Sequence, residues 1–593
     1  MAGDDEVSSK AASRLRQLSS HLSSNIPKEE QDGSKTSPSA KRRRRSPSSN
    51  LPTDYSDILS ELQKIKTIAS TPNPTNRGYI SQKQSGKLWV RERISLFLDP
   101  SSFHELGSVT GTATFTQTGP RTEQISTLTP SNNIQGFGLV TVPPSNTPRK
   151  IILTADDFSI RAGHLDGAVP AKSLLAEKLA LSLRIPIVKL VDGSSGGGSV
   201  TLIRKDGYSY IPTVRAFHHV VPQLNAGIPN LGAVLGPAVG LGAARVTACH
   251  FSVMAGDVGS LFNAGPKVVE GATFEEGLGV GELGGWEVHC RNGTVDNWAR
   301  DERGCFEQLK IALGFLPDHG GLAPPCERTE DDVEREDVGL RSVVPRRANR
   351  MYNPRTIIAS VVDRGSWFEI GALWGMTAIG GLARMGGRPV GIVSLNCEVN
   401  GGAIDAAGSQ KLTRLLKFCD VFNLPVVQFL DIPGYAIGTI AERSATMRWG
   451  IELAKTYYTT TMPIFAVITR RVYGVAGGVM VDCRDPMPRV AWPSGNWGSL
   501  PLDGGIEVGH RNELREAERA GKGGAKKKYQ ELEDEYLRLM NPVRTATKFG
   551  VEEIIDPKDT RKVVCTWVQH VYETLMLIRL ADRAAGRIHP SFT

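Results

Sequence analysis

The stretch that decides the fold is PIVKLVD (residues 186–192), which returns in closely similar form as PVVQFLD (residues 425–431). In both copies a helix-like segment precedes the proline, an apolar run of strand length follows it, and an aspartate opens a glycine-containing turn. Each copy is followed by a second proline-led apolar run, over residues 228–244 and 462–480. The sequence therefore predicts an α/β chain of two related halves, with glycine turns that present backbone N–H groups at strand ends.

A second pair of phrases supports the duplication independently. DPSSFHELG (residues 99–107) in the first half parallels DRGSWFEIG (residues 363–371) in the second. We expect an N-terminal domain over residues 85–330 and a C-terminal domain over residues 345–593, joined by a polar linker that contains the charge-dense residues 327–339.

The first 50 residues are polar and of low complexity, which predicts a disordered tail, followed by a lead-in over residues 51–84. The run KRRRR (residues 41–45) is interpreted as part of a solvated tail, with a nuclear address as the alternative. Five acidic residues count against a mitochondrial transit peptide: Asp4, Asp5, Glu6, Glu29 and Glu30. The sequence therefore favours the cytoplasm, with a mitochondrial location as the alternative.

Composition narrows the classes of function. The chain has 593 residues and a net charge of +8, part of which belongs to the tail, so the folded body is not expected to bind nucleic acid. Its eight cysteines form no CxxC pair, which favours a reduced compartment and no bound metal. Residues 225–244 are apolar and uncharged, but Pro229, Pro237 and several glycines predict a strand, a turn and a helix start, with no membrane span.

Four segments together resemble the carboxyltransferase (beta) subunits of biotin-dependent acyl-CoA carboxylases, the propionyl-CoA and methylcrotonoyl-CoA carboxylase group. The segments are GKLWVRERISLFLDPSSF (86–103), ELGGWEVHCRNGTVDNWARDE (282–302), GGAIDAAGSQKLTRLLKFCDVFNLPVVQFLDIPGY (401–435) and NPVRTATKFGVEEIIDPKDTR (541–561). The resemblance runs from about residue 85 to the C-terminus. It leaves the acyl substrate open.

The resemblance implies two crotonase-like (ClpP/crotonase) domains of strand-strand-helix repeats. It also implies a homo-oligomer, as a hexameric ring, in which the N-terminal half of one protomer faces the C-terminal half of another. The chain has no Met-Lys-Met biotinylation sequence and no GxxxxGK[ST] loop. We therefore expect a partner alpha subunit that carries biotin and the biotin carboxylase activity, with acyl-CoA as substrate.

The reaction implied is transfer of a carboxyl group from carboxybiotin to the alpha, or vinylogous gamma, carbon of a short or branched acyl-CoA. Negative charge then develops on the thioester oxygen of an enolate and on the ureido oxygen of biotin. Preorganised backbone N–H donors stabilise such oxyanions, and biotin itself can take the alpha proton, so no catalytic dyad or triad is expected. The alternatives are a biotin-dependent acyl-CoA decarboxylase subunit and a catalytically degenerate scaffold.

For the acyl-CoA oxyanion the candidates are Gly196 and Gly197 in DGSSGGGS, and the register can shift to Gly197 and Gly198. The family has an arginine where this chain has Ser199, and three glycines can also be a flexible turn alone. The candidates for binding the CoA part of the substrate are Arg161, Gly163 and Gly198, with an exposed structural arginine as the alternative for Arg161.

For the biotin oxyanion the candidates are the N–H groups of Val475 and Ala476, in the segment RVYGVAGGVM. Family members usually have Gly or Ala where this chain has Val475, but any residue except proline keeps the N–H group. The residues expected around the biotin group are Gly434, Tyr435, Gly438, Gly474 and Gly478. Gly478 stands where propionyl-CoA-specific enzymes have an acidic residue, which weakens a propionyl assignment. The alternative for this segment is close packing of a helix on a strand.

Overall fold

The two copies of the repeated phrase form central strands of two large sheets, as the sequence predicts. PIVKLVD contributes β6 (Ile187–Gly193) and PVVQFLD contributes β14 (Val426–Ile432), and every residue of both strands is buried. Apolar runs buried on both faces are typical of parallel strands covered by helices. The computed structural model describes residues 53–593, apart from residues 121, 165–166, 195–199, 348–349 and 482–488.

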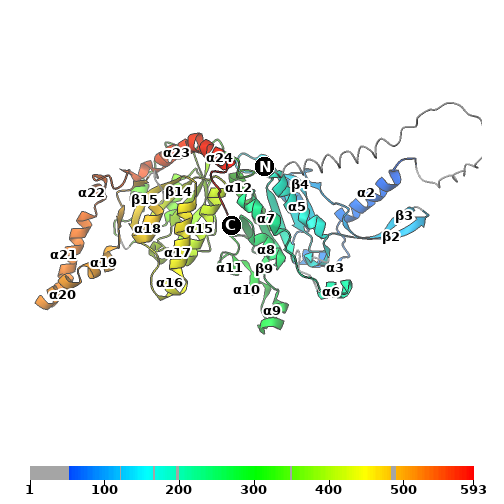
Figure 1. The fold of residues 1–593 in the computed structure, drawn as a ribbon, viewed down its shortest axis with the longest axis horizontal. Coiled ribbons are helices and arrows are strands. Elements are labelled where there is room, and N and C mark those ends of the chain that lie inside the picture. The colour runs from blue at the N-terminus through cyan, green and yellow to red at the C-terminus, as the bar shows by residue number, and fades with distance from the viewer. Residues whose placement is uncertain (1–52, 121, 165–166, 195–199, 348–349, 482–488) are drawn as a thin grey trace, which may run out of the picture. The chain divides into compact units, whose positions relative to one another are not determined.

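The chain divides into two compact units, Met1–Leu59 and Ser60–Thr593, and both sheets belong to the second unit. The first sheet, of which β4 and β9 are labelled in Figure 1, has the order β1-β4-β5-β6-β7-β8-β10, with β9 paired to β7. Its strands are β1 (His104–Glu105), β4 (Asn133–Val142), β5 (Thr147–Asp156), β6, β7 (Asn230–Val239), β8 (Phe251–Ala255), β9 (Ser260–Phe262) and β10 (Asn297–Ala299).

The second sheet repeats this order as β11-β12-β13-β14-β15-β16-β18, with β17 paired to β15. Its strands are β11 (Phe368–Glu369), β12 (Ala378–Met385), β13 (Arg388–Leu395), β14, β15 (Ile464–Tyr473), β16 (Arg489–Ala491), β17 (Asn496–Gly498) and β18 (Glu553–Ile554). In each sheet the first three strands are antiparallel neighbours and the following ones are parallel. The duplication predicted from the two pairs of phrases thus extends to the whole strand order.

Helices follow the strands of both halves in the same way. The helices and 3₁₀ turns of the first half and its lead-in are α2 (Ser56–Ser70), α3 (Arg77–Gln84), α4 (Val90–Phe97), η1 (Arg161–Gly163), α5 (Pro170–Leu183), α6 (Val200–Asp206), α7 (Phe217–Asn225), α8 (Leu241–Thr247), α9 (Pro266–Thr273), α10 (Val280–Gly284), α11 (Trp286–His289) and α12 (Glu302–Phe315). The run over residues 225–244 forms β7, a turn at Gly240 and the start of α8, as predicted.

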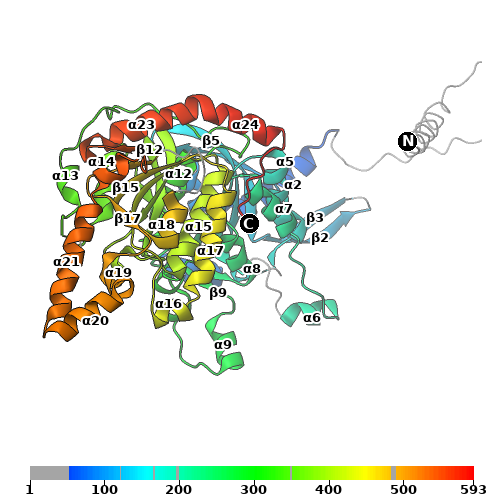
Figure 2. The ribbon, with the colours of Figure 1, turned by 60° about the vertical axis from the view of Figure 1, so that its left-hand side comes forward.

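In the second half, helices α15 and α17 lie side by side (Figure 2). Its elements are α13 (Leu340–Val343), α14 (Pro354–Val361), η3 (Asn400–Gly402), α15 (Ala406–Val421), α16 (Thr439–Arg443), α17 (Thr446–Thr459), α18 (Gly474–Val481), α19 (Leu502–Gly509), α20 (Arg511–Ala520), α21 (Gly524–Leu539), α22 (Pro542–Ala546), η4 (Pro557–Asp559), α23 (Thr560–His570), η5 (Val571–Leu575) and α24 (Met576–Ala584). Across the described residues, no helix combines the length and apolar character that crossing a bilayer requires.

One element has no counterpart in the repeat. Strands β2 (Gly111–Gly119) and β3 (Thr122–Pro130) form a separate two-stranded sheet between β1 and β4. The two large sheets, in contrast, share a core: the ring of Phe251 lies 5.5 Å from that of Phe368, and His250 packs on Phe418 of α15 and on Phe422 directly after it. Burial of these aromatic rings fixes the first half against the second.

Candidate active site

In the first half, two glycines bring a 3₁₀ turn into contact with the end of β6. Gly163 of η1 has φ 67° and Gly193 has φ 145°. A Cβ atom on Gly163 would lie 2.7 Å from the carbonyl oxygen of Asp192 and 2.8 Å from the Cα of Gly193. Only glycine permits this approach, so Gly163, predicted from the sequence as a CoA-side residue, lies directly beside the turn that follows β6.

The segment that contains the predicted acyl-CoA donors Gly196 and Gly197, together with Gly198, lies outside the described residues. The residue just before it is held on two sides. The carbonyl oxygen of Ser194 accepts a hydrogen bond of 2.9 Å from the N–H of Gly242 in α8, and its Oγ lies 2.8 Å from Nδ1 of His164. No local sequence pattern predicts this serine and histidine pair, because 30 residues separate its members.

A cavity of about 580 Å³ opens beside η1. It is lined by Gly78, Ser81, Phe158, Ser159, Arg161, Ala162 and His164. Arg161, the other residue predicted to bind CoA, is therefore part of the cavity wall, and His164 connects the cavity to the start of the glycine turn. A guanidinium group in such a wall can bind phosphate oxygens.

Buried charges hold the end of β6 in place. The carboxylate of Asp192 accepts hydrogen bonds of 2.8 Å from Lys87 and 2.7 Å from Arg93, and Arg93 also donates to Glu302. Burial lowers the pKa of Lys87 despite the neighbouring Asp192. Burial alone would also lower the pKa of Arg93. The carboxylates of Asp192 and Glu302 outweigh burial, so the pKa of Arg93 is raised. The aspartate of the repeated phrase is thus an ion-paired anchor of the turn.

The second half repeats this arrangement. The carboxylate of Asp431 accepts hydrogen bonds of 2.9 Å from Arg470 and 2.7 Å from Arg471, both in β15. Gly402 of η3 has φ 87°, and a Cβ atom there would lie 3.0 Å from the carbonyl oxygen of Asp431. Each half therefore has a glycine-containing 3₁₀ turn packed on the strand end that carries the aspartate.

The residues predicted for the biotin oxyanion lie in the first turn of α18. Gly474 has φ 62° and joins β15 to the helix, whereas the side chain of Val475 is 65% exposed and Ala476 is buried. The first N–H groups of an α-helix have no acceptor within the helix. Those of Val475 and Ala476 can therefore bind an oxygen atom from outside it, and the positive end of the helix dipole favours such a charge.

The remaining biotin-side candidates lie in two neighbouring segments. Gly434 (φ 131°) and Gly438 (φ 96°) flank Tyr435 in the loop after β14, and Gly478 lies in α18 after β15. Because β14 and β15 are adjacent parallel strands, both segments leave the same edge of the sheet. A Cβ atom on Gly434, Gly438 or Gly478 would meet nothing within 4 Å, so space is open at all three positions.

Tyr435 is the side chain among these glycines. Its hydroxyl donates a hydrogen bond of 3.1 Å to the carbonyl oxygen of Gly450, and burial raises its pKa. Gly450 packs under the ring, since a Cβ atom there would lie 2.4 Å from Tyr435. The tyrosine therefore has a fixed orientation in the loop after β14.

Within the described part of the chain, no group of three His, Cys, Asp or Glu side chains is arranged to hold a metal ion. The described cysteines other than Cys326 are buried, and burial raises the pKa of their thiols, to about 11 for Cys249 and about 12 for Cys290. Thiols with raised pKa values are poor nucleophiles.

Comparison with known proteins identifies similar chains. Residues 81–582 match the carboxyl transferase domain family. The beta chain of mitochondrial propionyl-CoA carboxylase from Sus scrofa is 31% identical over 82% of this chain and 85% of its own length. The alpha subunit of methylmalonyl-CoA decarboxylase from Veillonella parvula is 29% identical over 82% of this chain and 90% of its own length.

The fold also matches a solved structure. The transcarboxylase 12S hexamer crystallised with methylmalonyl-coenzyme A and methylmalonic acid superposes with a TM-score of 0.75, at 26% identity, over 88% of this chain and 96% of that one. The predicted pair of crotonase-like domains built from repeated strand-helix units is thereby confirmed. The individual site residues stay predictions.

Proposed function

The chain belongs to the carboxyl transferase family, and we propose that it moves a carboxyl group from carboxybiotin, carried by a partner subunit, to an acyl-CoA. The observation that carries this proposal is the repeated turn geometry. Each half has an ion-paired aspartate, a glycine 3₁₀ turn packed on it, and a helix that starts beyond the next parallel strand. Two such sites can each bind one developing oxyanion, and carboxyl transfer needs two.

The backbone supplies the donors in this proposal. Gly196 and Gly197 bind the thioester oxygen, and the N–H groups of Val475 and Ala476 bind the ureido oxygen of biotin. Such preorganised donors contribute about 3 kcal/mol each where charge develops in a water-excluded site. Bound biotin supplies the carboxyl group and the base for the alpha proton.

The biotin group fits the second half on three observations. The first-turn N–H groups of α18 are available, the side chain of Val475 is exposed, and a Cβ atom on Gly434, Gly438 or Gly478 would meet open space. Tyr435, between Gly434 and Gly438, is held in place by its hydrogen bond to Gly450. In the first half, Arg161 and Gly163 bind the CoA part of the acyl-CoA substrate, next to the cavity beside η1.

The acyl group is short or branched. Gly478 leaves open space at the position where the family resemblance implies an acidic side chain in propionyl-CoA-specific enzymes. An acyl chain bulkier than propionyl, or of different polarity, can occupy that volume. The carbon that accepts the carboxyl group is alpha to the thioester, or gamma if the acyl chain is unsaturated.

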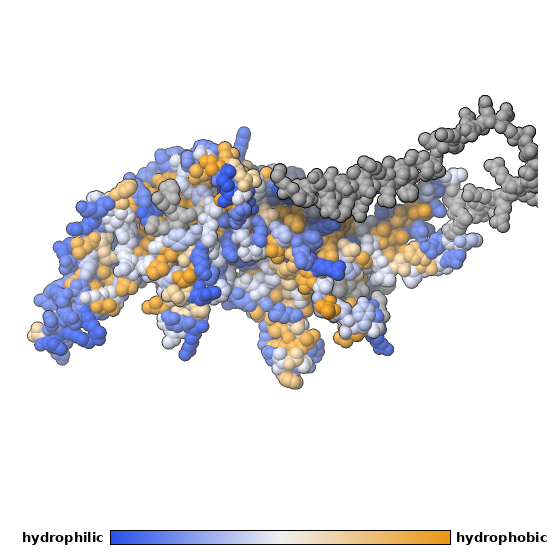
Figure 3. Space-filling model, in the orientation of Figure 1, coloured by the Kyte–Doolittle hydropathy of each residue, from blue (hydrophilic) through white to orange (hydrophobic). Residues whose placement is uncertain are grey.

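A second copy of the chain is part of this proposal. Large apolar side chains are exposed in both halves, among them Tyr208 after α6 and Phe274 at the end of α9 in the first, and Ile437, Ile440 and Val475 in the second. Figure 3 shows this apolar surface on the projection formed by α9. Exposed apolar surface of this kind marks an interface. We therefore propose a ring of six copies, with a biotin carboxylase and carrier subunit as its partner.

A second candidate function is the reverse reaction. The Veillonella parvula relative is named as a decarboxylase subunit, at nearly the same identity as the carboxylase chains. A decarboxylase would use the same two oxyanion sites to move a carboxyl group from a dicarboxylic acyl-CoA to biotin. A degenerate scaffold is the third candidate, favoured by Val475 and Gly478, which depart from the pattern that the family resemblance implies.

One experiment separates these candidates. The chain is reconstituted with its biotinylated partner and given, in one arm, ATP, labelled bicarbonate and a panel of acetyl-, propionyl-, butyryl- and methylcrotonoyl-CoA and, in a second arm, methylmalonyl-CoA labelled in its free carboxyl group. Label in one acyl product supports the carboxylase and identifies the substrate. Label that passes only from methylmalonyl-CoA to biotin supports the decarboxylase. A complex that assembles and does neither supports the scaffold.

A further inference from the structure

A second cavity, of about 920 Å³, lies away from the glycine turns. Its wall is formed by the end of α12, by Pro143 and Pro144, by residues 327–331 and 363–368, and by Arg384 and Gly387. The volume is within the range of small-molecule binding sites, roughly 300 to 1,000 Å³. Both halves and the segment that joins them contribute to this wall.

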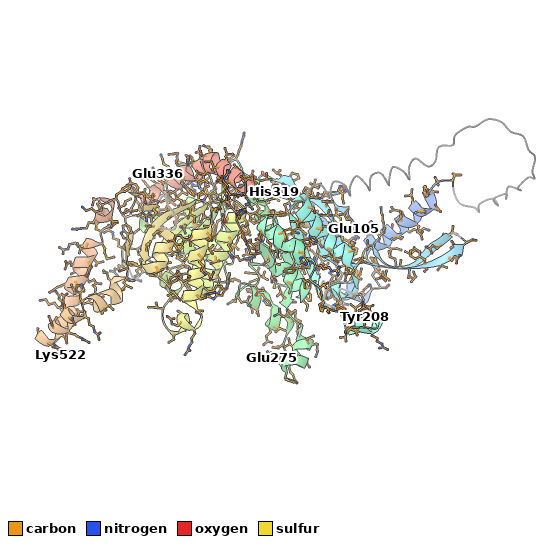
Figure 4. All side chains as sticks on the ribbon, viewed as in Figure 1. Glu105, Tyr208, Glu275, His319, Glu336 and Lys522 are labelled. Atoms are coloured by element: carbon orange, nitrogen blue, oxygen red, sulfur yellow. The ribbon has the colours of Figure 1, made fainter. Side chains whose placement is uncertain are left out.

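The cavity is separate from the proposed active site. Gly387 directly precedes β13 and Pro144 precedes β5, so the cavity lies at the amino ends of strands whose neighbours β6 and β14 carry the glycine turns at their carboxyl ends. β13 has eight residues, and a strand of that length spans about 26 Å at about 3.3 Å per residue. Glu336 and His319 are close in sequence to residues that line this cavity. Figure 4 shows them along the edge opposite to Tyr208 and Glu275.

Arg384 places a buried positive charge in this wall. The residue is 4% exposed, and its guanidinium donates hydrogen bonds to the carbonyl oxygens of Pro325 (2.9 Å), Gly387 (3.1 Å) and Gly314 (2.6 Å). Among the described residues, no carboxylate oxygen lies within ion-pair distance of it. Burial lowers the pKa of Arg384, although the carboxylate of Glu327 acts in the opposite direction. Buried charges are usually paired, and this one lacks an anion in contact.

Aromatic rings give the cavity an apolar side. The guanidinium of Arg384 lies 5.2 Å from the centre of the Phe315 ring, and Trp367 and Phe368 line the same cavity. Ile311 of α12 adds an aliphatic surface. A ligand that fits this wall has a flat or branched apolar body next to its negative group.

The wall carries charges of both signs. Asp363 is neutralised by Arg561 and by the N–H groups of Gly386 and Gly387. The wall also contains three glutamates and three further cations: Glu307, Glu327, Glu330, Lys310, Arg328 and Arg364. Arg384 differs from these three cations because it is buried, so the carboxylate of a ligand is expected at Arg384.

We propose that this cavity is a second binding site, for a small monocarboxylate with an aromatic or branched apolar body. The carboxylate lies at Arg384 and the body packs against Trp367 and Phe315. Because the wall joins both halves through residues 327–331, a bound ligand stabilises them together. The proposal does not depend on the reaction that the glycine turns perform.

The test is a calorimetric titration of the full chain with 2-naphthoate. One molecule is expected per chain, and the melting temperature is expected to rise with ligand concentration. The uncharged analogue 2-naphthylmethanol is expected to bind at least tenfold more weakly. No saturable binding, or equal binding of the alcohol, would overturn the proposal.

Two variants locate the site. Ile311→Trp fills the cavity from α12 and is expected to weaken naphthoate binding at least tenfold, whereas Val475→Pro, in the proposed biotin site, leaves it unchanged. Arg384→Met is expected to abolish binding, but the loss of three hydrogen bonds can also unfold the chain, so a folded Ile311→Trp protein decides the matter. Normal binding of naphthoate by Ile311→Trp, or loss of naphthoate binding in Val475→Pro, would contradict the assignment.

Discussion

The side chain of Asn297 and the main chain of Gly371 join the two sheets. The N–H of Gly371 donates a hydrogen bond of 2.9 Å to Oδ1 of Asn297, and Nδ2 of Asn297 donates one of 3.0 Å to the carbonyl oxygen of Glu369. Asn297 belongs to β10, at the edge of the first sheet, and Glu369 to β11, at the edge of the second. The amide thus takes the place of a peptide group between two strands that do not pair.

Asn297→Ala is expected to destabilise the chain by about 1–3 kcal/mol, because it leaves the N–H of Gly371 and the carbonyl oxygen of Glu369 without partners. Urea unfolding measures the change. Gln308→Ala is the matched control, since Gln308 bonds the same asparagine and the carbonyl oxygen of Trp298 but lies outside the bridge. Equal losses in the two variants would show that the bridge between the sheets has no special role.

Lys411 gives the stability of the chain a defined pH dependence. Its ammonium group is buried and donates to the carbonyl oxygens of Gly371, Trp374 and Ala378, and burial lowers its pKa to about 8. Between pH 8 and the ordinary lysine pKa near 10.5, the unfolded chain therefore binds one proton more than the folded chain. Stability from this group rises with pH across that window, by at most about 1.4 kcal/mol per pH unit.

The measurement is the difference in unfolding free energy between the wild type and Lys411→Met, from pH 7 to pH 10.5. Taking the difference removes the contribution of Lys172, whose pKa burial also lowers to about 8. Above pH 8, the unfolding free energy of the wild type is expected to rise relative to that of Lys411→Met. Below pH 8, the difference between the two is expected to stay constant. Parallel curves over the whole range would mean that Lys411 titrates normally.

Val475→Pro tests the proposed biotin oxyanion site without removing the helix. Proline is tolerated in the first turn of a helix, where the missing N–H has no intrahelical acceptor. Loss of this donor is expected to lower the rate of carboxyl transfer by about 10²–10³-fold. Val475→Ala keeps the N–H group and removes the exposed side chain, so it is expected to retain most of the rate. Equal effects of the two variants would place the function in the side chain.

Sequence patterns predicted those parts of the structure that local residues determine. The apolar runs after Pro186 and Pro425 become β6 and β14, and the run over residues 225–244 becomes a strand, a turn and a helix, because burial and glycine placement act within a few residues. The pairing of His164 with Ser194, the bridge from Asn297 and the cavity at Arg384 were not predicted. Each joins side chains that are distant in sequence, and no local pattern encodes such a contact.

Adjacent glycines in α18 provide a matched pair for the acyl side of the site. A Cβ atom on Gly477 would lie 2.9 Å from Cγ1 of Val472 and 3.0 Å from its backbone carbon, whereas one on Gly478 would meet nothing within 4 Å. Alanine stabilises a helix relative to glycine by about 0.5–1 kcal/mol when space allows. Gly478→Ala is therefore expected to raise the melting temperature, and Gly477→Ala to lower it.

The activity of Gly478→Ala then tests whether the open space serves the acyl group. If it does, kcat/KM falls for the bulkier acyl-CoA substrates of the panel and changes least for acetyl-CoA, while the protein is more stable. Substitution of a methyl group in a pocket changes binding by about 1–3 kcal/mol, or about 10–200-fold. A uniform effect on all substrates would point to the biotin side of the site. An unchanged panel would mean that the volume at Gly478 contacts neither substrate.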